Sequence, residues 1–338
     1  MDILIKSFNR PYYLDRCLQS IYFNCAASDF KIKVLDDGTP QKYLDKLQIK
    51  FPDISIQKSE FYYLKSEKCD LGLKPVTMEI PISLWITSVQ KASEYFVLLE
   101  DDFWFTSKIN LNKINEQAMI HNLAMLKLFW LSNSKFIQSN KNQKKELFTI
   151  YEPNIYTKNR LLYALGFHRF NKLKFREIFR FLGIFSEERF LAYYSIYAVA
   201  GVVFNKKYFL SLWKNNKNTI DEGLQIANAV AYISQNKSVF AHTNLEIVKT
   251  GFMSSATNQF KEEYSSKVDM FQFNKMINEA WFKEKLDVMS SFPNDISEVA
   301  ISEVLEASNS VIISSDDWKN WVENFRNQYI KMGCNIDY

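Results

Sequence analysis

Residues 95–102 read Tyr95-Phe96-Val97-Leu98-Leu99-Glu100-Asp101-Asp102, an apolar run that stops at three carboxylates. Such a run predicts a buried strand that ends where the charges begin. The arrangement also occurs twice earlier. The apolar stretch Asp2–Lys6 precedes Ser7-Phe8-Asn9, and Lys31–Leu35 precedes Asp36-Asp37-Gly38. Segments with helical periodicity separate these strands. The pattern therefore predicts an α/β protein with a mostly parallel central sheet flanked by helices.

The flanking segments give further expectations. Asn9 is expected to cap the helix that Pro11 opens. Pro81 is expected to kink a helix running from Pro75 to Ala92. Other expected helices are Gln41–Lys50, Lys206–Trp213, Ile220–Ile233 and an amphipathic series from about Asn258 to the end, with Trp318 and Trp321 as packing residues. Other expected strands are Leu123–Trp130, Glu146–Tyr151, Tyr193–Phe204 and Ser238–Lys249, with a polar turn at Asn140–Lys145.

The composition is that of a globular protein. The 338 residues are 47% hydrophobic and 24% charged, and the net charge is +4. These values exclude disorder along the whole chain and give no argument for nucleic acid. No apolar run reaches the roughly 18 residues of a membrane-spanning helix, and we recognise no signal peptide. Four cysteines without a CxxC pair indicate neither a zinc site nor a redox motif.

The polar groups after the three strands should converge, because the carboxyl ends of parallel strands share one edge of a sheet. Adjacent carboxylates repel one another, and a divalent cation would relieve that repulsion. Oxygen ligands favour Mg²⁺ or Mn²⁺, and such an ion could bridge to a diphosphate. The sequence has neither GxGxxG nor GxxxxGK[ST], so a phosphate would be bound without a glycine loop. Turn formation at Asp36-Asp37-Gly38 and helix capping by Glu100-Asp101-Asp102 are the structural alternatives.

This ordered set of motifs resembles the glycosyltransferases of the GT-A (nucleotide-diphospho-sugar transferase) fold, most closely the inverting family 2 type. The resemblance covers residues 2–105 well and is weaker from about 195 to 255. It is carried by Ile5-Lys6-Ser7-Phe8-Asn9-Arg10, Val34-Leu35-Asp36-Asp37-Gly38-Thr39, Asp70-Leu71-Gly72, Val97-Leu98-Leu99-Glu100-Asp101-Asp102 and, on the acceptor side, Ala200–Phe204 with Asp221-Glu222. It implies transfer of a sugar from a nucleotide-sugar donor to a glycan or glycolipid acceptor in bacterial surface polysaccharide assembly. The QxxRW element and the membrane helices of processive synthases are missing, so a single transfer is expected.

The resemblance also implies roles for residues on the donor side. Phe8 would stack on the nucleobase, and Asp37 would accept a hydrogen bond from it. Asp101 would lie near the ribose, and Asp102 would ligate the Mn²⁺ or Mg²⁺ that binds both phosphates. The full implied nucleotide-binding set is Ser7, Phe8, Asn9, Arg10, Asp36, Asp37, Lys74 and Asp101.

An inverting transferase needs one base to deprotonate the acceptor hydroxyl. In the family this is an acidic residue at the start of a helix, and here Asp221-Glu222 stands in that place. We expect Glu222 to be the base and Asp221 to be the second choice. Acidic residues in a first helical turn are stabilising in any case, which is the structural alternative. His242 is a candidate second metal ligand, although a single strand histidine is more commonly a hydrogen-bonded core residue. Thr250-Gly251 is expected to form a loop on the phosphate side.

The expected organisation is a GT-A domain over 1–255, with a donor half at 1–105 and an acceptor half at 106–255, and a helical C-terminal extension over 256–338. Basic and aromatic residues interleave over 159–189. This segment could form a lid, a contact with anionic membrane, or a hairpin that buries its phenylalanines. No nucleic-acid partner is expected. The expected location is cytoplasmic, with peripheral contact at the inner face of the plasma membrane.

Two other functions fit parts of the pattern. A sugar-nucleotide nucleotidyltransferase would also bind a nucleotide at this edge, but Ser7–Pro11 lacks the glycine-rich loop usual in that class. A non-catalytic nucleotide- or glycan-binding module of the same fold is the other alternative, and the carboxylates Asp101 and Asp102 argue against it.

Overall fold

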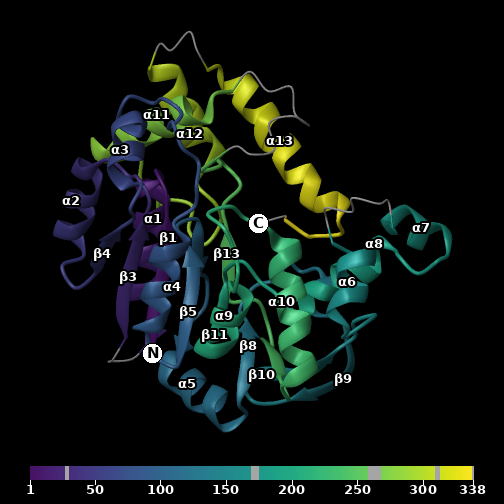
Figure 1. Cartoon of the computed structure of the whole chain (residues 1–338). Coiled ribbons are helices and arrows are strands. Elements are labelled where there is room, and N and C mark those ends of the chain that lie inside the picture. Colours follow the sequence, from purple (N-terminus) through teal and green to yellow (C-terminus); the bar gives the residue numbers. More distant parts are fainter. Residues whose placement is uncertain (27–29, 169–174, 258–267, 309–312, 337–338) are drawn as a thin grey trace.

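The computed structural model describes residues 1–26, 30–168, 175–257, 268–308 and 313–336, and a nine-stranded mixed sheet forms the centre of these parts (Figure 1). In spatial order the strands are β4 (Ser55–Lys58), β3 (Lys31–Asp36), β1 (Asp2–Ser7), β5 (Tyr95–Glu100), β11 (Val202–Asn205), β8 (Leu123–Lys127), β12 (Val239–Thr243), β10 (Phe148–Pro153) and β9 (Ser139–Lys144). The first four are mutually parallel, and β10 and β11 run against the other strands. The predicted mostly parallel sheet is therefore confirmed.

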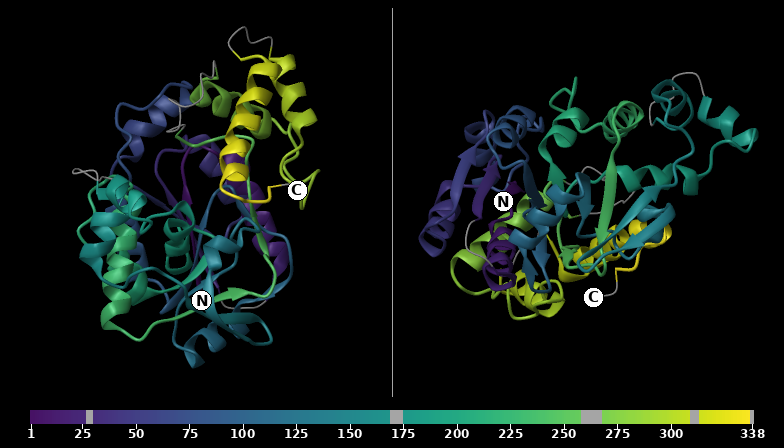
Figure 2. Two further views of the ribbon diagram at one scale, coloured as in Figure 1. Left: turned by 90° about the vertical axis from the view of Figure 1, so that its right-hand side faces the viewer. Right: turned by 90° about the horizontal axis from the view of Figure 1, so that it is seen from below.

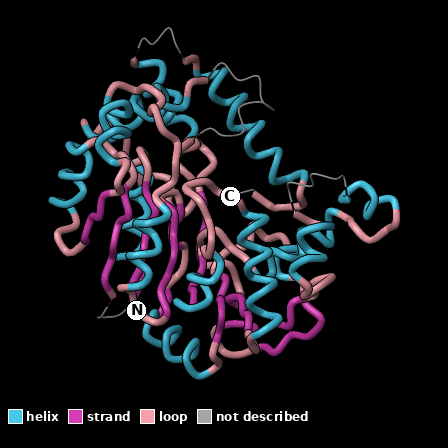
Figure 3. The backbone as a smooth tube through the Cα atoms, viewed as in Figure 1, coloured by secondary structure: helices cyan, strands magenta, loops and turns pink. Residues whose placement is uncertain are grey.

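Helices cover both faces of this sheet, because neighbouring strand residues point to opposite sides. In β1, Ile3 and Ile5 enter one buried core, and Leu4 enters the other. The first core is covered by α1 (Pro11–Asn24), α2 (Gln41–Lys50), α5 (Leu111–Ile120), α11 (Met270–Phe282), α12 (Glu298–Ala307) and α13 (Ser315–Lys331). The second is covered by α4 (Ile82–Gln90), α6 (Arg160–Gly166), α9 (Lys206–Leu212) and α10 (Glu222–Gln235). Figure 3 shows the strands enclosed by these helices.

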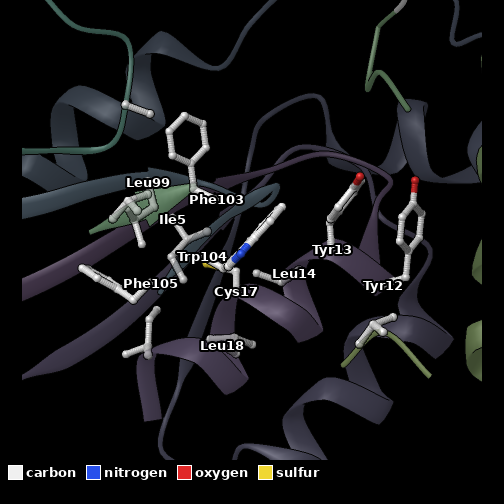
Figure 4. Close-up of a cluster of buried hydrophobic side chains, with 14 of the residues drawn as sticks. Ile5, Tyr12, Tyr13, Leu14, Cys17, Leu18, Leu99, Phe103, Trp104 and Phe105 are labelled. Carbon is white, nitrogen blue, oxygen red and sulfur yellow. The ribbon is translucent and has the colours of Figure 1, made fainter. Parts of the chain in front are cut away.

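The first core is densest where α1 lies against β1, β5 and β6 (Phe103–Phe105). Figure 4 shows this cluster, in which the rings of Tyr13 and Trp104 are stacked with centroids 6.4 Å apart. The strand β6 pairs with β13 (Val248–Thr250), and β2 (Cys25–Ala26) pairs with β7 (Ile109–Asn110). Since β6 follows directly after Glu100-Asp101-Asp102, burial of Trp104 fixes the place where these carboxylates emerge.

The C-terminal helices pack on the donor half of the chain. Figures 1 and 2 show α11, α12 and α13 over the end of the sheet toward which β1 runs. Asn278 of α11 donates to the backbone oxygen of Asn9 at 3.2 Å, and Trp281 donates to Asp15 at 2.8 Å. Trp318 and Trp321 are buried, which confirms their expected packing role. The division at residue 255 stays a prediction, and the expected helix start at Asn258 lies outside the described residues.

Five local predictions are wrong. The expected strand Ser238–Lys249 is divided into β12 and β13, which belong to different sheets. Asn9 is not the cap of α1: it has a left-handed φ of 54°, and Arg10 takes the N-cap position without a side-chain hydrogen bond. Residues 75–81 lie outside the helix, because Pro81 is the N-cap of α4 and does not kink it. The expected turn at 140–145 is largely strand β9, which pairs with β10. The segment 193–204 opens with a 3₁₀ turn, η2 (Tyr193–Ile196), and becomes a strand only at Val202.

The remaining short elements lie at the periphery. They are α3 (Tyr62–Asp70), η1 (Ser134–Ile137), α7 (Phe175–Phe181) and α8 (Glu187–Ala192). Within the described residues, no helix combines the length and the apolar character needed to cross a membrane.

Candidate active site

The turn after β3 is built by Asp36. Its carboxylate accepts hydrogen bonds from the backbone N–H groups of Gly38 (3.0 Å) and Thr39 (2.8 Å), and from the Thr39 hydroxyl at 2.6 Å. Asp36 is fully buried, and burial raises its pKa to about 6 although these hydrogen bonds act in the opposite direction. The turn expected as the structural alternative is therefore present, and the geometry gives Asp36 the role of holding it.

Phe8 and Asp37 both lie close to Lys65 at this turn. A Cβ atom on Gly38 would come within 3.1 Å of the Phe8 ring and 2.5 Å of the Lys65 side chain, so glycine lets these groups close around the turn. Lys65 Nζ lies 5.4 Å from the Phe8 ring centroid and 2.5 Å from Asp37 Oδ2. Burial raises the pKa of Asp37, while the contacts with Lys65 and Ser59 lower it. Lys65 therefore brings an aromatic ring and a held carboxylate together at this turn.

Arg10 joins the loop after β1 to the acidic end of β5. Its two terminal nitrogens donate to Asp101 Oδ1 at 2.5 Å and to Asp102 Oδ2 at 2.8 Å. The other oxygen of Asp101 accepts the Phe8 backbone N–H at 3.0 Å. All three charged side chains are buried, and their mutual pairing offsets the cost of removing them from water. Asp101 thus has protein partners on both oxygens and positions Phe8.

One carboxylate oxygen of Asp102 is left without a hydrogen-bond partner among the described residues. This atom, Oδ1, is buried. Burial raises the pKa of Asp102 to about 7; Arg10 lowers it, and the charges of Asp101 and Glu100 raise it. Mg²⁺ in nucleotide sites commonly uses one or two carboxylates together with substrate phosphates. The Asp102 Oδ1 atom therefore fits a divalent cation that takes its other ligands from phosphate and water.

His242 does not join this carboxylate. Its ring packs 5.1 Å from the Trp130 ring and 5.7 Å from the Tyr151 ring, and its Nδ1 lies 2.8 Å from the backbone oxygen of Thr243. Burial lowers its pKa. Within the described ranges, no group of three or more His, Cys, Asp or Glu is arranged to hold a metal. These are the contacts of the core histidine given as the alternative.

The two acidic candidates for the base, Asp221 and Glu222, have different hydrogen-bond partners at the start of α10. Asp221 is the N-cap: its Oδ1 accepts the Leu224 N–H at 3.0 Å and lies 3.2 Å from His168 Nε2. Glu222, the first residue of the helix, accepts the Tyr194 hydroxyl on Oε2 at 2.6 Å. Both side chains are half-buried. Asp221 is engaged in holding the helix, which leaves Glu222 the better placed to exchange a proton.

Tyr329 of the C-terminal helix α13 is half-buried, and its ring packs against Phe252 and Phe325. Burial raises the pKa of Tyr329, and the negative charges of Asp102, Glu100 and Glu222 raise it further. The backbone N–H of Gly251 also donates to the Asp102 backbone oxygen at 2.8 Å, which places the Thr250-Gly251 loop at the expected strand end.

The other predicted residues are placed as follows. Ser7 is buried at the end of β1, and Asn9 is held by Asn278. Glu100 pairs with Lys6 at 2.7 Å; burial opposes its ionisation, but Lys6 outweighs that effect and lowers its pKa. Lys74 is exposed in the loop after α3 and is not brought into contact with the others.

Sequence reasoning missed Lys65, Tyr194, Tyr329 and the pairing of His168 with Asp221. Of these, His168 alone lay in a segment already singled out, the basic and aromatic stretch 159–189. The other three carry no local motif, because each reaches the site from an element far away in the chain.

Comparison with known proteins gives structural neighbours alone. No protein-family model matches the chain, and no curated protein matches it in sequence. Three solved structures illustrate the similarity. S. aureus TarS 1–349 in complex with UDP is 10% identical, with 98% of this chain and 71% of that chain covered and a TM-score of 0.40. The galactosyltransferase LgtC in complex with donor and acceptor sugar analogs is 9% identical, with 98% and 100% covered and a TM-score of 0.36. The bifunctional glycosyltransferase WbbM is 11% identical, with 99% and 51% covered and a TM-score of 0.37. The similarity is distant in all three cases.

Proposed function

We propose that this chain is a glycosyltransferase of the GT-A fold that transfers a single sugar from a nucleotide-sugar donor to a glycan or lipid-linked acceptor. The observation that supports this most directly is one row of side chains at the carboxyl ends of β1, β3 and β5. It contains the Phe8 ring, the Asp37–Lys65 pair and the Asp102 carboxylate, whose Oδ1 has no hydrogen-bond partner among the described residues. Ligands of open parallel sheets bind at this edge.

The donor would lie along this row. Phe8 offers an aromatic face on which a nucleobase can stack, worth about 1–3 kcal/mol. Asp37 is fixed by Lys65 and Ser59 and can accept a hydrogen bond from a base N–H. Arg10 holds Asp101 and Asp102 in place, so the unpaired oxygen of Asp102 would be able to ligate a divalent cation that also binds the diphosphate. When bound there, Mn²⁺ or Mg²⁺ would offset the negative charge of the departing nucleoside diphosphate.

The acceptor would approach from α10. The Tyr194 hydroxyl holds Glu222 Oε2, so the other carboxylate oxygen can take the proton of the acceptor hydroxyl. Attack by that hydroxyl on the anomeric carbon, opposite the leaving diphosphate, inverts the configuration of the sugar. The proposal places this reaction in bacterial surface polysaccharide assembly, in the cytoplasm at the inner face of the plasma membrane.

A thermal-shift panel tests the donor side. Nucleoside diphosphates and sugar nucleotides are added with and without Mn²⁺, and a ligand at 100 times its Kd should stabilise the protein by about 2.7 kcal/mol. One nucleobase should be preferred, and Mn²⁺ should increase the shift. No shift with any nucleotide would contradict the proposal.

A matched pair of variants tests the acceptor side. Glu222→Gln should reduce transfer by about 10²–10⁴-fold, the usual contribution of a positioned general base. Donor binding should stay unchanged, because the nucleotide row is separate from α10. Asp221→Asn is the control, since asparagine caps helices as well as aspartate does. Loss of transfer in Asp221→Asn but not in Glu222→Gln would exchange the two roles. Hydrolysis or transfer of a sugar nucleotide by the parent protein distinguishes an enzyme from a binding module.

A further inference from the structure

The segment that contains α6 and α7 forms a hairpin that projects from the acceptor half (Figures 1 and 2). We define the hairpin as residues 156–168 and 175–185. Its inner side is a small aromatic core. Gly166 leaves room for the Phe179 ring, which a Cβ there would meet at 2.3 Å. The rings of Phe167 and the buried Phe185 lie 5.5 Å apart. For Phe167 and Phe185, this burial matches one of the three alternatives given for the segment, a hairpin that buries its phenylalanines.

A second set of apolar side chains points to solvent. Phe181 at the end of α7 is 90% exposed, and Leu161 at the start of α6 is 72% exposed. The other exposed members of the set are Leu162, Leu165, Ile178 and Leu182. Scattered exposed apolar residues are common, but six on one small projecting element indicate a surface that binds a partner.

The same segment is strongly basic. In the described residues of the hairpin, Lys158, Arg160, Arg176 and Arg180 stand against one acidic residue, Glu177, which gives a net charge of +3. Lys158, Arg160 and Arg180 are exposed. Arg180 and Arg176 pair with Glu187 at 3.1 and 3.2 Å, so one acidic residue of α8 partly offsets them. Apolar side chains among lysines and arginines suit the interface of an anionic bilayer, where each basic residue adds about 1 kcal/mol of attraction.

We propose that the hairpin docks on an anionic phospholipid surface. Phe181 and Leu182 enter the headgroup region, and the basic residues pair with lipid phosphates. The hairpin also lies against the start of the helix that carries the proposed base: α6 packs against α10, and His168 lies 3.2 Å from Asp221, the residue before Glu222. Docking there would present a lipid-linked acceptor to Glu222, a consequence that rests on the proposed glycosyltransferase function. The docking itself does not depend on it.

Vesicle flotation tests the docking. The probes are vesicles of phosphatidylcholine alone and of phosphatidylcholine with phosphatidylglycerol, at ~0.15 M salt and again at 1 M, where the Debye length falls to about 3 Å. The full chain should float with the anionic vesicles alone, and binding should weaken at high salt. The double variant F181S/L182S should bind more than about tenfold more weakly, since it removes two apolar side chains from the interface. Ile49→Ser on α2, where the side chain is 84% exposed, is the matched control and should bind like the parent protein.

Several results would overturn the proposal. These are equal binding to both kinds of vesicle, full binding by F181S/L182S, or tighter binding to a single-stranded oligonucleotide than to anionic vesicles. A dimer in light scattering that F181S/L182S dissociates would assign the surface to a second copy of the chain instead. The nucleotide thermal shift is measured on the same samples. If the protein fails to bind vesicles but still shows the nucleotide thermal shift, the docking is wrong and the proposed function stands. If it binds anionic vesicles but shows no shift with any nucleotide, the docking stands and the proposed function is wrong.

Discussion

Replacement of Arg10 by methionine should destabilise the fold by about 3–5 kcal/mol, the usual cost of removing one partner of a buried ion pair. Arg10 is 5% exposed, and it is the shared partner of Asp101 (2%) and Asp102 (9%). Without the guanidinium, two adjacent buried carboxylates lose their cation. The carboxylates also repel each other, so the upper half of the range is expected.

The assay is urea unfolding followed by circular dichroism, with EDTA present so that no metal ion can replace the missing charge. Arg10→Lys should fall between the parent protein and Arg10→Met, because a lysine keeps the charge but cannot donate to both carboxylates as a fork does. Lys42→Met is the matched control. Lys42 pairs with Asp70 and Glu279 in a partly exposed setting, so its loss should cost no more than about 1 kcal/mol. If Arg10→Met is as stable as Lys42→Met, the buried bridge does not stabilise this strand end.

Phe8→Ala should weaken nucleotide binding by about 1–3 kcal/mol in isothermal titration; an unchanged affinity would place Phe8 outside the donor pocket. Asp102→Asn keeps an acceptor for Arg10 but removes the charge, so it should abolish the Mn²⁺-dependent part of the nucleotide thermal shift. If Mn²⁺ still increases the shift fully, Asp102 is not the metal ligand. Lys127→Met tests pH dependence: burial lowers the pKa of Lys127 to about 7, so above that pH the folded state loses a proton that the unfolded state keeps. Relative to Lys127→Met, the parent protein should therefore gain up to about 2.7 kcal/mol of unfolding free energy between about pH 7 and about pH 9, and parallel pH profiles in urea would contradict the burial effect.

The sequence by itself determined the elements whose signal is local. The strands β1, β3 and β5 are apolar runs with a polar stop, and their carboxylate ends were predicted from that contrast alone. Glu222 at the start of a helix and the packing of Trp318 were also predicted, because helical periodicity repeats within a few residues. Secondary-structure predictions from local sequence were wrong where the same segment is compatible with two conformations. The polar stretch at 140–145 is largely a strand because β10 offers it a partner. Residues 75–81 are a loop because the helix α4 begins only after Pro81, its N-cap.

The tertiary structure decided the contacts that give those residues their roles. Each of these contacts joins residues that are far apart in the sequence. Arg10 and Asp101 are 91 positions apart, Lys65 and Asp37 are 28 apart, and Tyr194 and Glu222 are also 28 apart. The tertiary structure also decided that both oxygens of Asp101 have protein partners while one oxygen of Asp102 has none among the described residues, although the two are neighbours in sequence. Hydrophobic periodicity says which face of an element is buried, but not which other element covers it. That depends on the order of strands in the sheet and on how helices pack, so the pairing of charges at the site follows from the fold as a whole.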